Sequence, residues 1–227
     1  GSHGCSAHNL MRQAILGATL ELIERRAVVL WWQGKLPASR LPEDLLASLK
    51  VTSLLDAARA GAKECRDTTL FYLNYPGPVL VVAASSCDQE GSQIALAFAA
   101  GLELAATAQR AVLEVLSVEV ETTDLAYARH SGAAVERQSR RGLVAARQRA
   151  FETSHRDLLP SKPDGSLGSF DPKISIADLL GSYAARGETI LLADLTRADI
   201  GLPTCRAFFE NRDLQPHFPG EFDLSPL

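Results

Sequence analysis

The hydrophobic pattern predicts two helical stretches at the start of the chain. Between Asn9 and Trp32, apolar residues recur at steps of three and four, at Ala14, Ile15, Ala18, Leu22 and Ile23. This spacing is typical of a helix with one buried face. Residues 41–62, LPEDLLASLKVTSLLDAARAGA, continue the helical pattern, with Pro42 at a first-turn position and Gly61 as the stop.

Two later regions carry the pattern of strands. Residues 69–85, TLFYLNYPGPVLVVAAS, predict two strands around a Pro-Gly-Pro turn, because β-branched and aromatic residues flank the turn. Residues 93–121 predict a strand, a glycine turn and a long helix. Residues 179–209, LLGSYAARGETILLADLTRADIGLPTCRAFF, predict a helix, a strand, a proline turn and a second strand.

Two segments with unusual composition separate these regions. Residues 128–150 are rich in arginine, and we expect a helix there. Residues 160–172, PSKPDGSLGSFDP, combine Pro, Gly and Ser without periodicity and predict a mobile loop.

Parts of the pattern repeat at an offset of 125 residues. The pairs are Leu54-Leu55 with Leu179-Leu180, Leu70 with Leu195, and Pro78 with Pro203. A Leu-Glu core also occurs twice, at Leu20-Glu21-Leu22-Ile23 and at Leu113-Glu114-Val115-Leu116. We therefore expect an α/β (α+β) fold with two related helix/sheet halves, in which helices cover the sheets.

Composition narrows the classes of function. The net charge of −4 argues against a nucleic-acid partner. No apolar run approaches the roughly 18 residues of a membrane span, so we expect no membrane association and a cytoplasmic protein. The four cysteines lack metal-ligand spacing. Residues 1–3, Gly-Ser-His, match a tag scar, although a native origin stays open.

The candidate chemistry lies on the first helix. The chain contains neither a P-loop nor a G-x-G-x-x-G turn. At 100° per residue, Glu21, Glu24 and Arg25 share one helix face with Gln13 and Gly17, among small or apolar neighbours. One interpretation is a structural ion pair between Glu21 and Arg25, four residues apart. The other is a Mg²⁺ site formed by the two carboxylates, with the guanidinium meeting a phosphate.

These residues belong to a segment that resembles a known family. Residues 4–32, GCSAHNLMRQAILGATLELIERRAVVLWW, are similar to the signature of YcaO-type proteins, N-G-x-A-A-x-N-x-x-x-E-A-I-L-x-A-L-L-E-L-I-E-R-D-A-x-x-x-W-W. FAAGLELAATAQRAVLEVL, LLADLTRADIGLPTCRAFF and LQPHF follow in the family's order. The resemblance is greatest to members that modify ribosomal peptides, and it covers the carboxy-terminal portion of the YcaO domain. Residues 1–227 would then be a single YcaO-like domain or that portion of one.

The resemblance implies an activity and a set of site residues. Such proteins are cyclodehydratases that use ATP and Mg²⁺ to activate backbone amides of a precursor peptide and close Cys, Ser or Thr side chains into azolines. By position, it implies cofactor-binding roles for Asn9, Gln13, Glu21, Glu24 and Arg25, with Glu21 and Glu24 as metal ligands. Catalytic residues stay unassigned. A partner protein or a missing half would supply leader recognition and the rest of the ATP site, and a homo-oligomer is also compatible.

Four positions depart from the family's pattern. Gln13 stands where the family has glutamate, and Arg26 where it has aspartate. Ser117 and Glu119 replace the Gln and Arg of L-x-Q-x-R. A carboxylate facing a triphosphate would repel it, so these departures favour an alternative: a catalytically silent YcaO-like subunit that binds a precursor peptide or an active partner as a scaffold.

Overall fold

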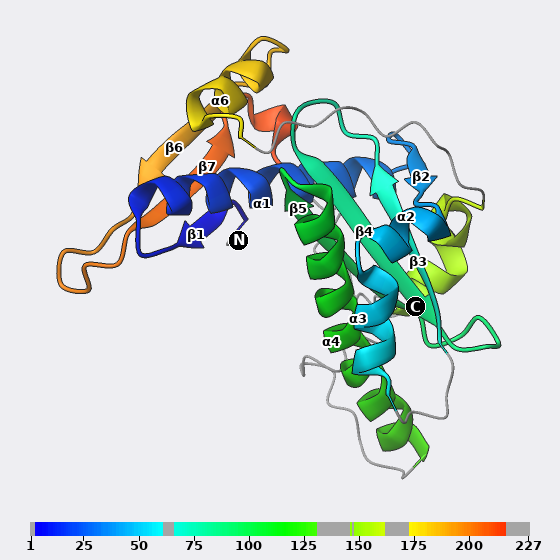
Figure 1. Ribbon diagram of the computed structural model, residues 1–227. Coiled ribbons are helices and arrows are strands. Elements are labelled where there is room, and N and C mark those ends of the chain that lie inside the picture. The colour runs from blue at the N-terminus through cyan, green and yellow to red at the C-terminus, as the bar shows by residue number, and fades with distance from the viewer. Residues whose placement is uncertain (1–2, 61–65, 131–145, 147, 162–172, 217–227) are drawn as a thin grey trace.

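Two antiparallel sheets and one long helix that contacts both of them organise the molecule (Figure 1). The computed structural model describes residues 3–60, 66–130, 146, 148–161 and 173–216. Its elements are, in chain order, β1 (Cys5–Ala7), α1 (Met11–Trp32), β2 (Ala38–Arg40), α2 (Glu43–Ser48), α3 (Val51–Ala58), β3 (Asp67–Leu73), β4 (Leu80–Cys87), β5 (Ala95–Gly101), α4 (Leu104–His130), η1 (Phe151–His155), η2 (Arg156–Leu158), α6 (Ile176–Ala184), β6 (Ile190–Asp194), β7 (Thr204–Phe209) and η3 (Arg212–Leu214).

The larger sheet has the strand order β2-β3-β4-β5, and the smaller one has the order β1-β7-β6. All described strand pairs are antiparallel, with Phe71 opposite Ala83 in the larger sheet and Ser6 opposite Cys205 in the smaller one. Strand β5 is therefore an edge strand, and its outer side is open to groups from the helices beside it.

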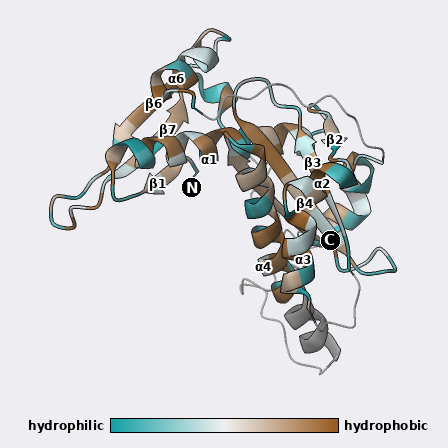
Figure 2. Ribbon diagram, viewed as in Figure 1, coloured by the Kyte–Doolittle hydropathy of each residue, from teal (hydrophilic) through white to brown (hydrophobic). Residues whose placement is uncertain are grey.

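Both faces of the larger sheet are buried, because successive side chains of a strand point to opposite faces. Phe71 and Leu73 belong to the core cluster that contains α1, whereas Leu70 and Tyr72 belong to the cluster that contains α3 and α4. This explains why β4 is apolar or small at nearly every position. Figure 2 shows hydrophobic residues concentrated along β4, in the middle of these layers.

Helix α1 also contacts β1 and β7 of the smaller sheet. Its small buried residues, Ala14, Ala18 and Ala27, allow this close packing, and Trp31 fills the far end of the same core. Helix α1 therefore packs against both sheets and joins them in one hydrophobic core.

Most of the elements expected from the sequence are confirmed. The first helix begins at Met11 rather than Asn9, and the helical stretch 41–62 is broken because Lys50 adopts a left-handed φ of 59°. Each half contains a helix followed by an antiparallel hairpin, α3-β3-β4 and α6-β6-β7, as the repeat predicts.

Other expectations fall largely outside the described residues. Residues 131–145 and 147 of the arginine-rich segment lie there, and so do residues 162–172 of the predicted loop. Among the described helices, none is both long and apolar enough to cross a membrane. Cys5, Cys87 and Cys205 are free thiols.

Candidate functional site

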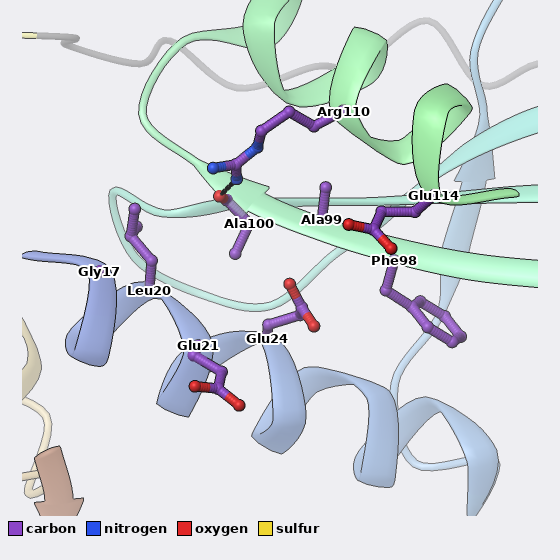
Figure 3. Close-up of a pocket in the computed structure, with 9 residues that line it drawn as sticks. All are labelled: Gly17, Leu20, Glu21, Glu24, Phe98, Ala99, Ala100, Arg110 and Glu114. Atoms are coloured by element: carbon purple, nitrogen blue, oxygen red, sulfur yellow. Dashed lines mark hydrogen bonds between the residues drawn. The ribbon is translucent and has the colours of Figure 1, made fainter. Parts of the chain in front are cut away.

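A cavity of about 220 Å³ lies at the free edge of β5, between α1 and α4 (Figure 3). Its walls come from three elements that are distant in the sequence. The lining residues are Gly17, Leu20, Glu21 and Glu24 from α1, Phe98, Ala99 and Ala100 from β5, and Arg110 and Glu114 from α4. The two glutamates predicted as metal ligands therefore border one cavity.

The α1 wall follows from helical spacing. Gly17, Glu21 and Glu24 are four and three residues apart, so their positions lie along one side of the helix. Gly17 also lets β1 approach, because a Cβ atom there would collide with Ser6 Oγ. Residue 17 thus lines the cavity with no side chain of its own.

The carboxyl group of Glu24, on the α1 side of this cavity, has a perturbed pKa. Burial, reinforced by the charge of Glu21, raises the pKa of Glu24 to about 7. Arg25, Arg110 and a hydrogen bond with the Ala100 backbone act in the opposite direction but offset this only in part. Without a further cation, Glu24 therefore holds its proton to a higher pH than an exposed glutamate does.

Arg25 lies beside both glutamates. Its Nε is 3.8 Å from Glu21 Oε1, and its Nη2 is 3.8 Å from Glu24 Oε1. The ion pair expected from the i, i+4 spacing is thus present, although long. This geometry is compatible with the structural interpretation and with the metal-site interpretation.

The α4 wall adds charges of both signs. Arg110 and Glu114 are one turn apart, and Arg110 Nη2 donates a hydrogen bond to the carbonyl oxygen of Ala100. In Figure 3 the side chains of Glu24 and Glu114 reach into the space between α1 and α4. The backbone of Ala100 thus interacts with Glu24 from one helix and Arg110 from the other.

Three residues predicted for the site do not line the cavity. Asn9 is exposed just before α1, where its Oδ1 contacts His8 Nδ1. Gln13 lies in the first turn of α1, one turn before Gly17. Its buried Oε1 has no hydrogen-bond partner among the described residues. Arg25 approaches only through its ion pairs. The roles of these three residues in nucleotide binding stay predictions.

Glu119, one of the departures from the family's pattern, forms an ion-pair network away from the cavity. Its side chain is buried and pairs with Arg59 Nη2 and, at 3.7 Å, with Arg66 Nε. Glu119 is five positions after Glu114, so it lies about 140° around the helix from Glu114, which lines the cavity. Ser117, the other departure on α4, donates to the Leu113 carbonyl oxygen of its own helix. Neither residue lines the cavity.

Arg110 and Glu114 were missed as site residues. One signal for Glu114 was present, because the repeated Leu-Glu core pairs it with Glu21 and both line the cavity. No comparable signal marks Arg110, whose position depends on how α4 packs against β5.

The donor set suits a hard cation. Among the described residues, no group of three or more His, Cys, Asp or Glu side chains is placed to hold a metal ion. Mg²⁺ commonly uses only one or two carboxylates and completes its shell with phosphate oxygens and waters. Glu21 and Glu24 supply two carboxylates at one cavity, and a cation bound beside Glu24 would favour its ionised form.

Several solved structures share the fold. A heterocyclase in complex with substrate and cofactor matches with a TM-score of 0.68 and 22% identity, over 92% of this chain and 28% of that one. YcaO from Methanopyrus kandleri, bound with AMPPCP and Mg²⁺, matches with a TM-score of 0.59 and 19% identity, over 92% and 54%. The E. coli microcin synthetase McbBCD complex with pro-MccB17 bound matches with a TM-score of 0.61 and 15% identity, over 92% and 53%.

These structures share an α/β architecture with the chain, which spans only between about a quarter and a half of their length. Among curated protein sequences, none matches the chain. The family model described as YcaO cyclodehydratase, ATP- and Mg²⁺-binding, matches residues 1–209. That match includes all the elements that border the cavity, from α1 to α4. The chain belongs to the YcaO cyclodehydratase family.

Proposed function

We propose that this chain holds Mg-ATP at the β5 edge and takes part in activating backbone amides of a ribosomally made precursor peptide, which then form azolines from Cys, Ser or Thr. The observation that carries the proposal is the cavity lined by Glu21 and Glu24 of α1 and by Arg110 and Glu114 of α4, into which the Glu24 side chain points. A cytoplasmic setting, where Mg-ATP is available, is part of the proposal.

Each charged residue has a defined task in this proposal. Glu21 and Glu24 would bind Mg²⁺, because carboxylate oxygens are ligands that this hard cation prefers. Arg25, 3.8 Å from both carboxylates, would hold them in position while the metal is absent. When bound, ATP supplies a phosphoryl group that turns the amide oxygen into a leaving group. The low exposure of Glu24 would strengthen its interaction with the cation.

The size of the cavity supports a site that is shared with further protein. Pockets that enclose a drug-sized ligand measure about 300–1,000 Å³, whereas this cavity measures about 220 Å³. It suits a metal ion and phosphate groups better than an entire nucleotide. We propose that another protein segment or subunit completes the nucleotide site and recognises the leader of the precursor. McbBCD, a structural relative, is a multi-protein complex that binds a precursor.

Calorimetric titration with Mg-ATP tests this function. The parent chain, in its natural assembly, should bind Mg-ATP, and Glu21→Gln and Glu24→Gln should each weaken binding at least tenfold, since each removes one charged ligand. Glu43→Gln, which changes an exposed glutamate on α2, is the matched control and should bind like the parent. Unchanged affinity in both site variants would leave Glu21 and Glu24 as a structural ion pair with Arg25.

The alternative is a catalytically silent subunit that acts as a scaffold for a precursor peptide or an active partner. The observation in its favour is Gln13, which stands where the family carries a carboxylate and whose buried Oε1 finds no hydrogen-bond partner within the described part of the chain. The scaffold alternative predicts that the parent chain binds the precursor peptide in its natural assembly, but binds no Mg-ATP with or without that peptide.

A further inference from the structure

We propose that Arg110 binds the β- or γ-phosphate of the nucleotide from the side of the cavity opposite Glu21 and Glu24. This inference rests on the proposed function and assigns a role to a residue that the sequence motifs did not identify. Arg110 is the one arginine among the residues that line the cavity in the described part of the chain.

The charge of the cavity requires such a residue. Glu21, Glu24 and Glu114 border it, and all three are acidic. Mg²⁺ bound to the α1 glutamates would offset two of these charges, but a polyphosphate would still meet Glu114 on the α4 side. Arg110, one turn before Glu114, places a permanent positive charge at that wall.

Three other described arginines in this part of the fold have acidic partners. Arg59 and Arg66 pair with Glu119 away from the cavity. Arg25 interacts with Glu21 and Glu24. On the α4 side, Arg110 is therefore the cation that the described residues offer to a phosphate in this cavity.

The present contact of Arg110 is compatible with this role. Its Nη2 donates to the Ala100 carbonyl oxygen, and this bond engages one of the five N–H donors of a guanidinium. The edge strand thus orients the planar group beside the cavity before a ligand arrives. A planar, pre-oriented guanidinium is well suited to bidentate contact with phosphate oxygens.

The test is binding of Mg-ATP, Mg-ADP and AMP to the full chain in its natural assembly, measured by calorimetry for the parent, Arg110→Gln and Arg110→Lys. Arg110→Gln should weaken Mg-ATP binding about tenfold to a hundredfold, the range of a charged hydrogen bond. AMP affinity should change by less than about threefold, because AMP lacks the β- and γ-phosphates. Arg110→Lys keeps the positive charge but lacks the planar pair of N–H donors, so its Mg-ATP affinity should lie between those of Arg110→Gln and the parent.

The controls separate this role from a structural one and from failure of the proposed function. Arg212→Gln removes an exposed arginine on η3 and should bind like the parent. Equal loss of affinity for all three nucleotides would make Arg110 a structural residue and overturn the inference. Parent-like Mg-ATP affinity in Arg110→Gln would overturn the inference while leaving the proposed function intact. A parent chain that binds no nucleotide would overturn both.

Discussion

At the scale of single residues, Glu24 combines two properties that usually exclude each other. Its side chain is only 14% exposed, yet it borders a cavity that holds a second carboxylate from its own helix. Burial penalises the ionised form and the neighbouring Glu21 charge adds to this penalty, so the pKa of Glu24 rises to about 7. Glu24 therefore makes the ligand-free fold less stable at neutral pH, where the site would work, than at acidic pH.

The raised pKa of Glu24 predicts that Glu24→Gln stabilises the chain, and that this stabilisation grows as pH rises. The pKa in the folded chain lies above the ordinary value of 4.5, so between these values the folded chain retains a proton that the unfolded chain releases. The free energy of unfolding of the parent then falls as pH rises through this window, and the loss is complete above about pH 7. Without Mg²⁺, the variant should be more stable than the parent by about 2–3 kcal/mol at pH 8, relative to their difference at pH 4.

Urea unfolding of the parent and Glu24→Gln at pH 4, 6 and 8 measures the effect. Glu43→Gln should show no comparable change, because Glu43 is exposed. A stability difference between parent and Glu24→Gln that is the same at pH 4 and pH 8 would contradict the raised pKa of Glu24.

At the scale of elements, the structure explains why α4 carries Glu119 where the family has an arginine. Glu119 is buried between Arg59, which follows α3, and Arg66, which precedes β3. Arg59 also donates to Thr68 Oγ1, and Arg66 donates to Ser86 Oγ. The carboxylate thus joins α3 and α4 to the end of the β3–β4 pair, where the side chains of two arginines require a counter-charge.

We expect Glu119→Ala to destabilise the chain by about 3–5 kcal/mol, because removing one member of a buried ion network leaves the others uncompensated. Glu90→Ala, at an exposed position in the turn after β4, should change stability by less than about 1 kcal/mol. Denaturant unfolding checks both values. A loss below 1 kcal/mol in Glu119→Ala would mean that the two arginines are solvated well enough without Glu119.

At the scale of the whole molecule, a polar contact joins the two halves in addition to α1. Tyr75, in the turn after β3, donates from its hydroxyl to Glu188 Oε1 at 2.9 Å. Glu188 also pairs with Arg186, whose guanidinium lies 4.7 Å from the centre of the Tyr183 ring. This contact fastens the turn of the larger sheet to the segment that leads from α6 into β6.

A double-mutant cycle measures the strength of this connection. Tyr75→Phe should lower the free energy of unfolding by about 1–2 kcal/mol, since a hydrogen bond to a charged acceptor is lost. With Glu188→Gln as the second change, the coupling energy should be about 1 kcal/mol. Hydrogen exchange in Tyr75→Phe should accelerate in α6 and β6 before α4. Additive effects of the two substitutions would show that the contact does not couple the halves.

Local sequence was sufficient for most of the elements, though not for β1 and β2, and for the residues on the α1 side of the cavity. The spacing of apolar residues predicted α1 and placed Glu21, Glu24 and Arg25 on one face of it, because helical periodicity is a local property. The hairpins β3–β4 and β6–β7 could be predicted in the same way, because Pro78 and Pro203 interrupt runs of β-forming residues. The resemblance of residues 4–32 then indicated the family, which the family model confirms.

Tertiary structure alone decided the rest of the site. Arg110 and Glu24 line the same cavity because α1 and α4 pack on opposite faces of one sheet and converge at its open edge, a relation between residues far apart in the chain. The same packing turns Glu119 away from the cavity and toward Arg59 and Arg66. It also buries Glu24, and burial, which no local pattern encodes, is what raises the pKa of that carboxyl group.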